Sequence, residues 1–271
     1  MKRRLFLFIT LLVFSMVLAA CASSEDSSSD GAGEANDTSE EKEVIVIGVD
    51  DKFAPMGFRD ENNELVGFDI DYARAAAEYM GVEVKFQPID WKTKENELNS
   101  GRIDLIWNGY TITPEREEKV DFTKPYLANS QVVATLVDSD IESLEDLEGK
   151  NVGLQALSSA MDALQDHPIY EKIGTVTEFS DNVLALNDLK SGRVDAVVID
   201  EVVINYYMSI EENTFKVLDE SLAPELYGVG VKKGNTELLN KLQEALDKMN
   251  EDGTAAEISK KWFGEDKILK D

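Results

Sequence analysis

Arg116 is the residue of this chain best suited to bind a carboxylate. It lies shortly after Thr111, and its planar guanidinium can take both oxygens of a carboxylate at once. The alternative is an ion pair on the surface with Glu115, Glu117 or Glu118, a type of contact that contributes little to stability. From the residues alone, both roles stay open.

Two further positions favour small charged ligands. Ser158 and Ser159 precede the run Ala160–Leu164, so they lie where a helix is expected to begin, and a helix start offers free N–H groups to an anion. Ordinary N-capping is compatible with that role. Asp200 follows an apolar run, so its carboxylate needs a cationic partner, unless it caps a helix beginning near Val202.

The elements around these residues indicate an α/β fold. The apolar run 44–49 is typical of a strand buried in a parallel sheet, and 71–80 predicts a helix that ends at Gly81. A second strand is expected over 82–86. The order strand, helix, strand implies a right-handed crossover.

A near-repeat indicates two such units. Residues 98–106 are echoed by 189–197, and each segment reads as a helix end, a glycine and a buried strand. Helix capping alone could produce this pattern. Polar residues follow both strands, however, at 107–111 and 199–201, and ligands bind at the carboxyl ends of strands in open α/β sheets. We therefore expect two similar lobes that face each other across a cleft.

The phrase Gly67–Tyr72, followed by an alanine-rich helix, resembles family 3 of the bacterial extracellular solute-binding proteins, which are receptors for polar amino acids in import systems. The resemblance extends from Val44 to Gly264. Its specificity lies in the order of the motifs, which include 48–50, 111–116, 121–126, 152–153, 191–200 and 252–254.

The resemblance implies a two-lobed periplasmic-binding-protein-like fold of type II, with two open α/β sheets joined by a two-strand hinge. Lobe 1 would comprise 44–130 and 228–271, and lobe 2 would comprise 131–227. The chain would cross between them near 129–133 and 226–231. A ligand would bridge the lobes and favour the closed state, which a permease would recognise.

The resemblance also implies roles for the site residues. Arg116 and Ser159 would bind the α-carboxylate of an amino acid from opposite lobes. Asp200 would bind its ammonium group, together with the carbonyl of Gly109 and the hydroxyl of Thr111.

Recognition of the ligand side chain is more ambiguous. Asp50 and Phe53 would supply an acid and an aromatic wall, which suit a cationic side chain but also an amide or a disulfide-linked amino acid. Trp91 and Trp107 could both be core residues, and the core interpretation is preferred for Trp91. The predicted ligand-binding set is Asp50, Phe53, Trp107, Asn108, Gly109, Tyr110, Thr111, Arg116, Gln155, Ser158, Ser159 and Asp200.

The first residues predict export. A basic start at Lys2–Arg4 precedes an apolar run over 5–18, which is shorter than the ~20 residues that span a bilayer. Small residues then lead to Cys21, an arrangement similar to a lipobox, in which this cysteine is acylated. We expect a lipoprotein signal peptide over 1–21 rather than an uncleaved anchor. Residues 22–43, rich in Ser, Glu and Asp, would form a disordered tether at the extracytoplasmic face of the membrane.

Composition excludes several classes of function. The net charge of −27 argues against nucleic acid as a partner. No metal-ligand spacing, nucleophile motif or cofactor motif is present, so neither a metal nor a cofactor is expected. The prediction is a monomeric binding protein, not an enzyme, that captures a cationic, cystine-type or glutamine-type amino acid for an ABC permease and its ATPase. The alternative is an enzyme similar to cyclohexadienyl dehydratase on the same fold.

Overall fold

The computed structural model describes residues 43–270. The predicted signal peptide with Cys21, and the predicted tether up to residue 42, lie outside the described residues. Within 43–270, no helix is both long enough and apolar enough to cross a membrane.

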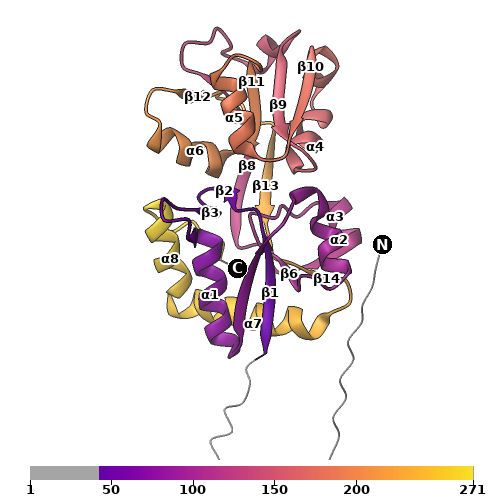
Figure 1. Ribbon diagram of the computed structural model, residues 1–271, viewed down its shortest axis with the longest axis vertical. Coiled ribbons are helices and arrows are strands. Elements are labelled where there is room, and N and C mark those ends of the chain that lie inside the picture. The colour runs from indigo at the N-terminus through magenta and orange to yellow at the C-terminus, as the bar shows by residue number, and fades with distance from the viewer. Residues whose placement is uncertain (1–42, 271) are drawn as a thin grey trace, which may run out of the picture. The chain divides into compact units, whose positions relative to one another are not determined.

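Lobe 1 is built on a five-stranded sheet with the order β5-β1-β6-β14-β7 (Figure 1). The apolar run of β1 pairs in parallel with β5 and β6, while β14 is antiparallel to β6 and β7. Both faces of this sheet are covered, so β1 is apolar on both sides. The strands are β1 (Val44–Val49), β5 (Glu83–Pro88), β6 (Leu105–Ile106), β7 (Val120–Phe122) and β14 (Gly230–Lys232).

The helices of lobe 1 come from both the N-terminal and the C-terminal parts of the described chain. Helix α1 packs on α7 and α8, so the C-terminal helices return to this lobe (Figure 1). Helix α1 begins at Phe68, three residues before the predicted start, because Phe68 and Ile70 are buried on its inner face; it ends at Gly81 as predicted, where φ is 70°. The helices are α1 (Phe68–Met80), η1 (Trp91–Thr93), α2 (Lys94–Asn99), α3 (Pro114–Lys119), α7 (Thr236–Asp252) and α8 (Thr254–Phe263). A small sheet consists of β2 (Lys52–Phe53), β3 (Gly57–Arg59) and β4 (Leu65–Val66).

Lobe 2 has a second sheet with the order β10-β9-β11-β8-β12. Side chains along β11 alternate between two apolar clusters, Ala196 and Val198 on one face and Val197 and Ile199 on the other, so helices cover both faces. The strands are β9 (Asn151–Gln155), β10 (Thr175–Phe179), β11 (Ala196–Asp200) and β12 (Phe215–Val217). The helices are η2 (Leu144–Leu147), α4 (Ser159–Asp166), η3 (Pro168–Lys172), α5 (Asn182–Lys190) and α6 (Glu201–Ile210).

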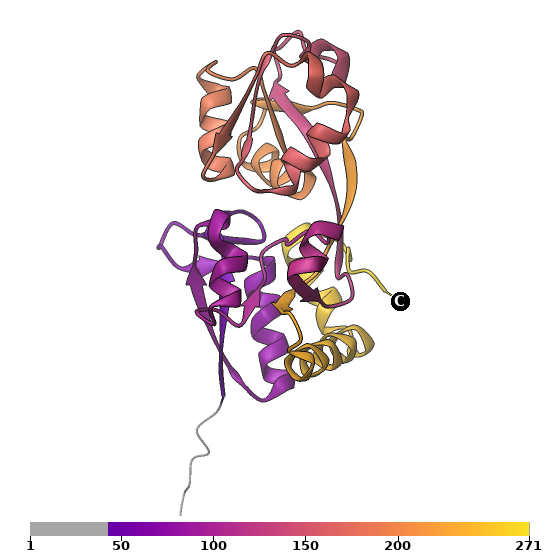
Figure 2. The same ribbon diagram turned by 90° about the vertical axis from the view of Figure 1, so that its right-hand side faces the viewer.

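Two long strands connect the lobes. Strand β8 (Leu127–Leu136) pairs in an antiparallel manner with β13 (Ala223–Tyr227), and Figure 2 shows both strands running from one lobe to the other. The predicted lobe boundaries fall within β8, between residues 130 and 131, and at the end of β13. Two α/β sheets joined by a two-strand hinge are the predicted fold, which is confirmed.

Candidate ligand-binding site between the lobes

A narrow cavity of about 10 Å³ lies between the two lobes. This is far smaller than the roughly 300–1,000 Å³ typical of pockets for drug-sized ligands and holds about one water molecule, so the lobes are closed on each other and must part to admit an amino acid. Most of the predicted ligand-binding residues meet here. Lobe 1 contributes Phe53, Trp91, Gly109, Thr111 and Arg116, and lobe 2 contributes Gln155, Ser158, Ser159 and Asp200.

Arg116 enters the cavity from α3. Thr113 caps this helix, since its hydroxyl accepts from the Arg116 backbone N–H at 3.2 Å. The Arg116 side chain is only 6% exposed, donates to the Thr111 carbonyl at 2.9 Å and lies 4.8 Å from the centre of the Tyr110 ring. Glu115 pairs with Lys119 instead, so the surface ion pair considered for Arg116 is not formed. A buried guanidinium held by neutral groups retains its charge for an anion.

The start of helix α4 faces Arg116 across the cavity. Ser158 caps the helix, accepting from the Ala160 N–H at 3.3 Å and donating to the Gln155 carbonyl at 2.7 Å. Ser159 is the first helical residue, and its hydroxyl oxygen lies 3.1 Å from the hydroxyl oxygen of Thr111 in lobe 1. The helix start and Arg116 therefore place free N–H donors and a full positive charge at the same cavity.

Asp200 also lines the cavity, as the last residue of β11. It is 5% exposed, and its Oδ1 accepts from the Asn129 amide at 2.8 Å and from the Tyr227 hydroxyl. It occupies the N-cap position of α6, but its side chain caps nothing, so the capping alternative is not observed. Burial, and next the nearby charge of Glu225, raise the pKa of Asp200 to about 7.

Glu225 is a buried acid that sequence reasoning missed. It comes from the hinge strand β13 and is 9% exposed. Its Oε2 accepts from the Thr111 hydroxyl at 3.2 Å, the Asn129 amide at 2.9 Å and the Gln131 amide at 3.0 Å. The available signal was the two-residue period of a strand, which places Glu225 on the same face as Tyr227.

Asp50 and Gln155 form the part of the site expected to meet a ligand side chain. Asp50 follows β1, and its Oδ2 accepts from the Gln155 amide of lobe 2 at 2.7 Å. Its Oδ1 accepts from the Lys52 backbone N–H at 3.0 Å, whereas the Lys52 side chain pairs with Asp181. Among residues 43–270, Asp50 therefore has no ion-pair partner. Burial raises its pKa to about 6.

Four predicted residues lie behind the cavity wall and do not line it: Asp50, which contacts the lining residue Gln155, and three residues that follow β6. Trp107 packs in the lobe 1 core, edge-on to Tyr72, and Asn108 is buried beside Gly57. Tyr110 lies under the Arg116 guanidinium and donates to Glu95 at 3.0 Å.

Trp91 belongs to the apolar core of lobe 1, as preferred from the sequence, but also lines the cavity. Its ring meets the Tyr110 ring edge-on, with centroids 5.8 Å apart. Sequence reasoning therefore found its core role and missed its exposure to the site.

Asp69 holds the ligand-binding loop in place. This residue of the motif 67–72 is fully buried, and its Oδ2 accepts from the Gly109 N–H at 2.7 Å. Burial raises its pKa to about 7. Gly109 has a φ of 56°, and a Cβ there would lie 2.8 Å from the Phe53 ring, so glycine is required. The sequence flagged the motif but not this positioning role.

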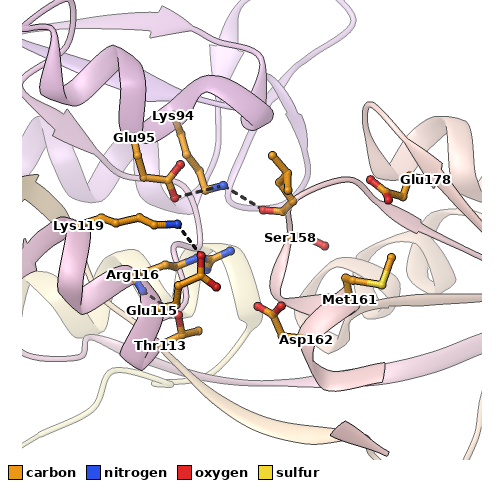
Figure 3. A pocket seen from close by; sticks show the side chains of 11 residues that line it. Lys94, Glu95, Thr113, Glu115, Arg116, Lys119, Ser158, Met161, Asp162 and Glu178 are labelled. Carbon is orange, nitrogen blue, oxygen red and sulfur yellow. Dashed lines mark hydrogen bonds and ion pairs between the residues drawn. The ribbon is translucent and has the colours of Figure 1, made fainter. Parts of the chain in front are cut away.

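An outer cavity opens beside Arg116 and Ser158, and Figure 3 shows the side chains that line it. Lys94, another residue that sequence reasoning missed, is 2% exposed and reaches across the cleft to the Leu157 carbonyl at 2.9 Å. Its ammonium lies 5.0 Å from the centre of the Trp91 ring, and burial lowers its pKa to about 8. Together with the pairs Asp50–Gln155 and Thr111–Ser159, this contact joins the lobes around the inner cavity.

Metal-binding clusters are not found in the described part of the chain: no group of three or more His, Cys, Asp or Glu side chains could hold an ion there.

Comparison with known proteins gives consistent matches. Residues 45–265 match the bacterial extracellular solute-binding proteins, family 3. The chain is 29% identical over 230 residues to the L-cystine-binding protein TcyJ of Escherichia coli K12, a match that covers 83% of this chain and 85% of TcyJ. It is 30% identical over 265 residues to the arginine-binding extracellular protein ArtP of Bacillus subtilis, covering 97% and 98%.

Solved structures show the same fold. A substrate-binding protein of an ABC uptake transporter from Streptococcus pneumoniae, with bound histidine, has 42% identity and a TM-score of 0.81, covering 84% of this chain and 95% of that one. An ancestral arginine-binding protein bound to arginine has 42% identity and a TM-score of 0.78, covering 83% and 100%. The ancestral amino acid-binding protein AncCDT-1, a precursor of cyclohexadienyl dehydratase, has 35% identity and a TM-score of 0.75, covering 81% and 95%. These matches confirm the resemblance found in the sequence, and the chain belongs to family 3 of the bacterial extracellular solute-binding proteins.

Proposed function

We propose that this protein captures a free amino acid outside the cytoplasm and presents it to an ABC permease when its lobes close. The observation that carries the proposal is that residues of opposite charge, Arg116 and Asp200, line the same small cavity. A zwitterion that leaves water needs partners of both signs. Arg116 and the start of α4 would bind its carboxylate, and Asp200 would bind its ammonium group.

The ligand we favour carries a cationic side chain. Asp50 is buried and held only by neutral donors, so a guanidinium or ammonium group would supply its missing counter-charge. Phe53 and Trp91 line the cavity nearby and can add cation–π attraction. The arginine and histidine bound by similar proteins agree with this class. Glutamine and cystine are the competing ligands.

A thermal-shift screen of the standard amino acids and cystine tests the proposal. A ligand that binds only the folded state stabilises it by about 2.7 kcal/mol at 100 times its Kd, so arginine, lysine or histidine should raise the melting temperature by several degrees. A shift with cystine or glutamine alone would move the assignment to the neutral class. A flat response to every compound would contradict amino acid capture.

We propose binding rather than catalysis at this site. The carboxyl groups near the cavity are held by hydrogen bonds: Asp50, behind the cavity wall, accepts from Gln155, and Asp200 accepts from Asn129 and Tyr227. A general acid must keep its proton while the substrate is bound, whereas Asp200 is expected to face the ammonium group of the ligand as a carboxylate. Turnover of a cyclohexadienyl substrate by the purified protein would contradict this proposal.

We also propose that acylated Cys21 attaches the protein to the membrane. The support is the basic, apolar and small-residue pattern that ends at this single cysteine. Cys21→Ser should release the protein from the membrane fraction into the medium or periplasm, whereas Ser23→Ala should leave it attached. Detection of both variants in washed membranes, by immunoblotting, would contradict the anchor.

A further inference from the structure

The hinge contains two buried carboxylates that share one amide donor. The Asn129 side-chain N–H₂ on β8 donates to Asp200 at 2.8 Å and to Glu225 at 2.9 Å, so a single nitrogen holds one oxygen of each acid. Both side chains are less than a tenth exposed. Like charges held this close in a buried site resist simultaneous ionisation.

The charged and titratable groups around the pair do not neutralise it. Within residues 43–270, neither Asp200 nor Glu225 forms an ion pair. Tyr227 on β13 donates its hydroxyl proton to Asp200, and Asp162 on α4 adds a further acid near Glu225. Arg116 on α3 is the positive charge that acts on Asp200, but its guanidinium is engaged at the Thr111 carbonyl.

The two acids face different surroundings. Glu225 Oε2 accepts from Thr111, Asn129 and Gln131 inside the hinge. Asp200 accepts from Asn129 and Tyr227, with Gln131 as a further donor, and is the acid of the pair that lines the ligand cavity. Because burial raises the pKa of Asp200, the shared proton is placed on Asp200, where a ligand ammonium would bind.

We propose that the unliganded protein holds a proton on the Asp200–Glu225 pair, and that an amino acid ammonium group replaces this proton and releases it to solvent. This rests on the proposed function. The incoming ammonium supplies the positive charge that the proton had supplied, so the charge of the hinge stays constant. The raised pKa of Asp200, for which Glu225 is the second cause after burial, agrees with this exchange.

The sign of the effect follows from linkage. Because the ligand binds the deprotonated pair, affinity rises with pH as Asp200 loses its proton. With a pKa of about 7, about half a proton is released per ligand at pH 7, and affinity is about tenfold lower at pH 6 than at pH 8. Asp50, with a pKa of about 6, adds about a tenth of a proton at pH 7 when it pairs with a cationic ligand.

Isothermal titration with L-arginine at pH 7, in phosphate and in Tris, counts the released protons, because the two buffers differ in ionisation enthalpy. The wild type should release about half a proton per arginine. In Glu225→Gln, the second cause of the raised pKa of Asp200 is removed while burial, the first cause, remains, so the release should decrease without vanishing and affinity should vary less with pH. Glu220→Gln, the same change at an exposed site, should behave like the wild type.

Three outcomes distinguish the hypotheses. Proton release by the wild type that decreases in Glu225→Gln supports the inference, and a merely structural role for Glu225 would not reduce it. Arginine binding without proton release in the wild type, or equal release in both variants, overturns the inference and leaves the proposed function intact. Failure of the wild type to bind any amino acid overturns the proposed function and the inference with it.

Discussion

The two charged groups of the cavity are held in different ways. The charge of Arg116 comes from the short helix α3 and is held by a carbonyl and an aromatic ring. Around Asp200, the charges lie on the hinge strands and at the end of β11, where amides and a hydroxyl hold two acids together.

The two groups differ in whether their charge changes with pH. An arginine stays protonated in proteins, so the carboxylate-binding group keeps a constant charge at any physiological pH. Asp200 is a buried acid with a raised pKa, so by the inference above its ionisation would depend on pH and on the ligand. Capture of the carboxylate should therefore be constant, whereas capture of the ammonium should be adjustable. The buried contacts inside the cavity also differ from the exposed ion pair at the rim of the cleft.

Removal of Arg116 should have the largest effect on ligand affinity. Arg116→Ala takes away the only cation that lines the inner cavity of the described chain, so we expect affinity for any amino acid to fall by ~10²–10³-fold. Calorimetric titration measures the loss. Arg102→Ala, in an exposed pair with Glu97, is the matched control and should bind normally. Retained affinity in a folded Arg116→Ala would place the carboxylate elsewhere.

Much of the fold could be predicted because local patterns decide it. The apolar run of β1 and the left-handed glycine after α1 are visible in the sequence, and the near-repeat indicated two units. The start of α1 was misplaced because Phe68 and Ile70 are buried by contacts that no local pattern shows. The amino acid order fixes periodicity, but tertiary packing sets the ends of elements.

The site was less predictable from the sequence where distant segments meet. Arg116, Ser159 and Asp200 lie beside recognisable element ends, so the sequence pointed to them, and the structure brings them to one cavity. Glu225 and Lys94 depend on contacts between lobes and hinge that no spacing reveals. Trp107 and Trp91 are both followed by polar residues, and only packing decides which ring reaches the cavity.

Asp50→Asn should have an intermediate effect on affinity and would show whether the charge of Asp50 contributes to ligand binding besides Arg116 and Asp200. The change keeps the size of the side chain but removes its negative charge, so affinity for arginine should fall by about tenfold while affinity for glutamine changes little. Competition titrations give the ratio of the two affinities. Asp51→Asn, at the neighbouring and more exposed acid paired with Arg59, is the control. Equal losses for both ligands would indicate a neutral side-chain site.

Lys52→Met should have the smallest effect, because it acts at the rim. Lys52 pairs with Asp181 of lobe 2 at 3.0 Å, but its side chain is 56% exposed, and exposed pairs contribute about 0–1 kcal/mol. Asp181 also retains its capping bond to the Leu184 N–H at 2.9 Å after the change. We expect affinity to fall less than about fivefold at low salt, and the difference to vanish at high salt. A loss as large as that of Arg116→Ala would mean that closure of the lobes depends on the Lys52–Asp181 pair at the rim. Solvent screening leaves an exposed pair too weak to hold the lobes together by itself. Such a loss would therefore require that the open and closed states are nearly equal in free energy.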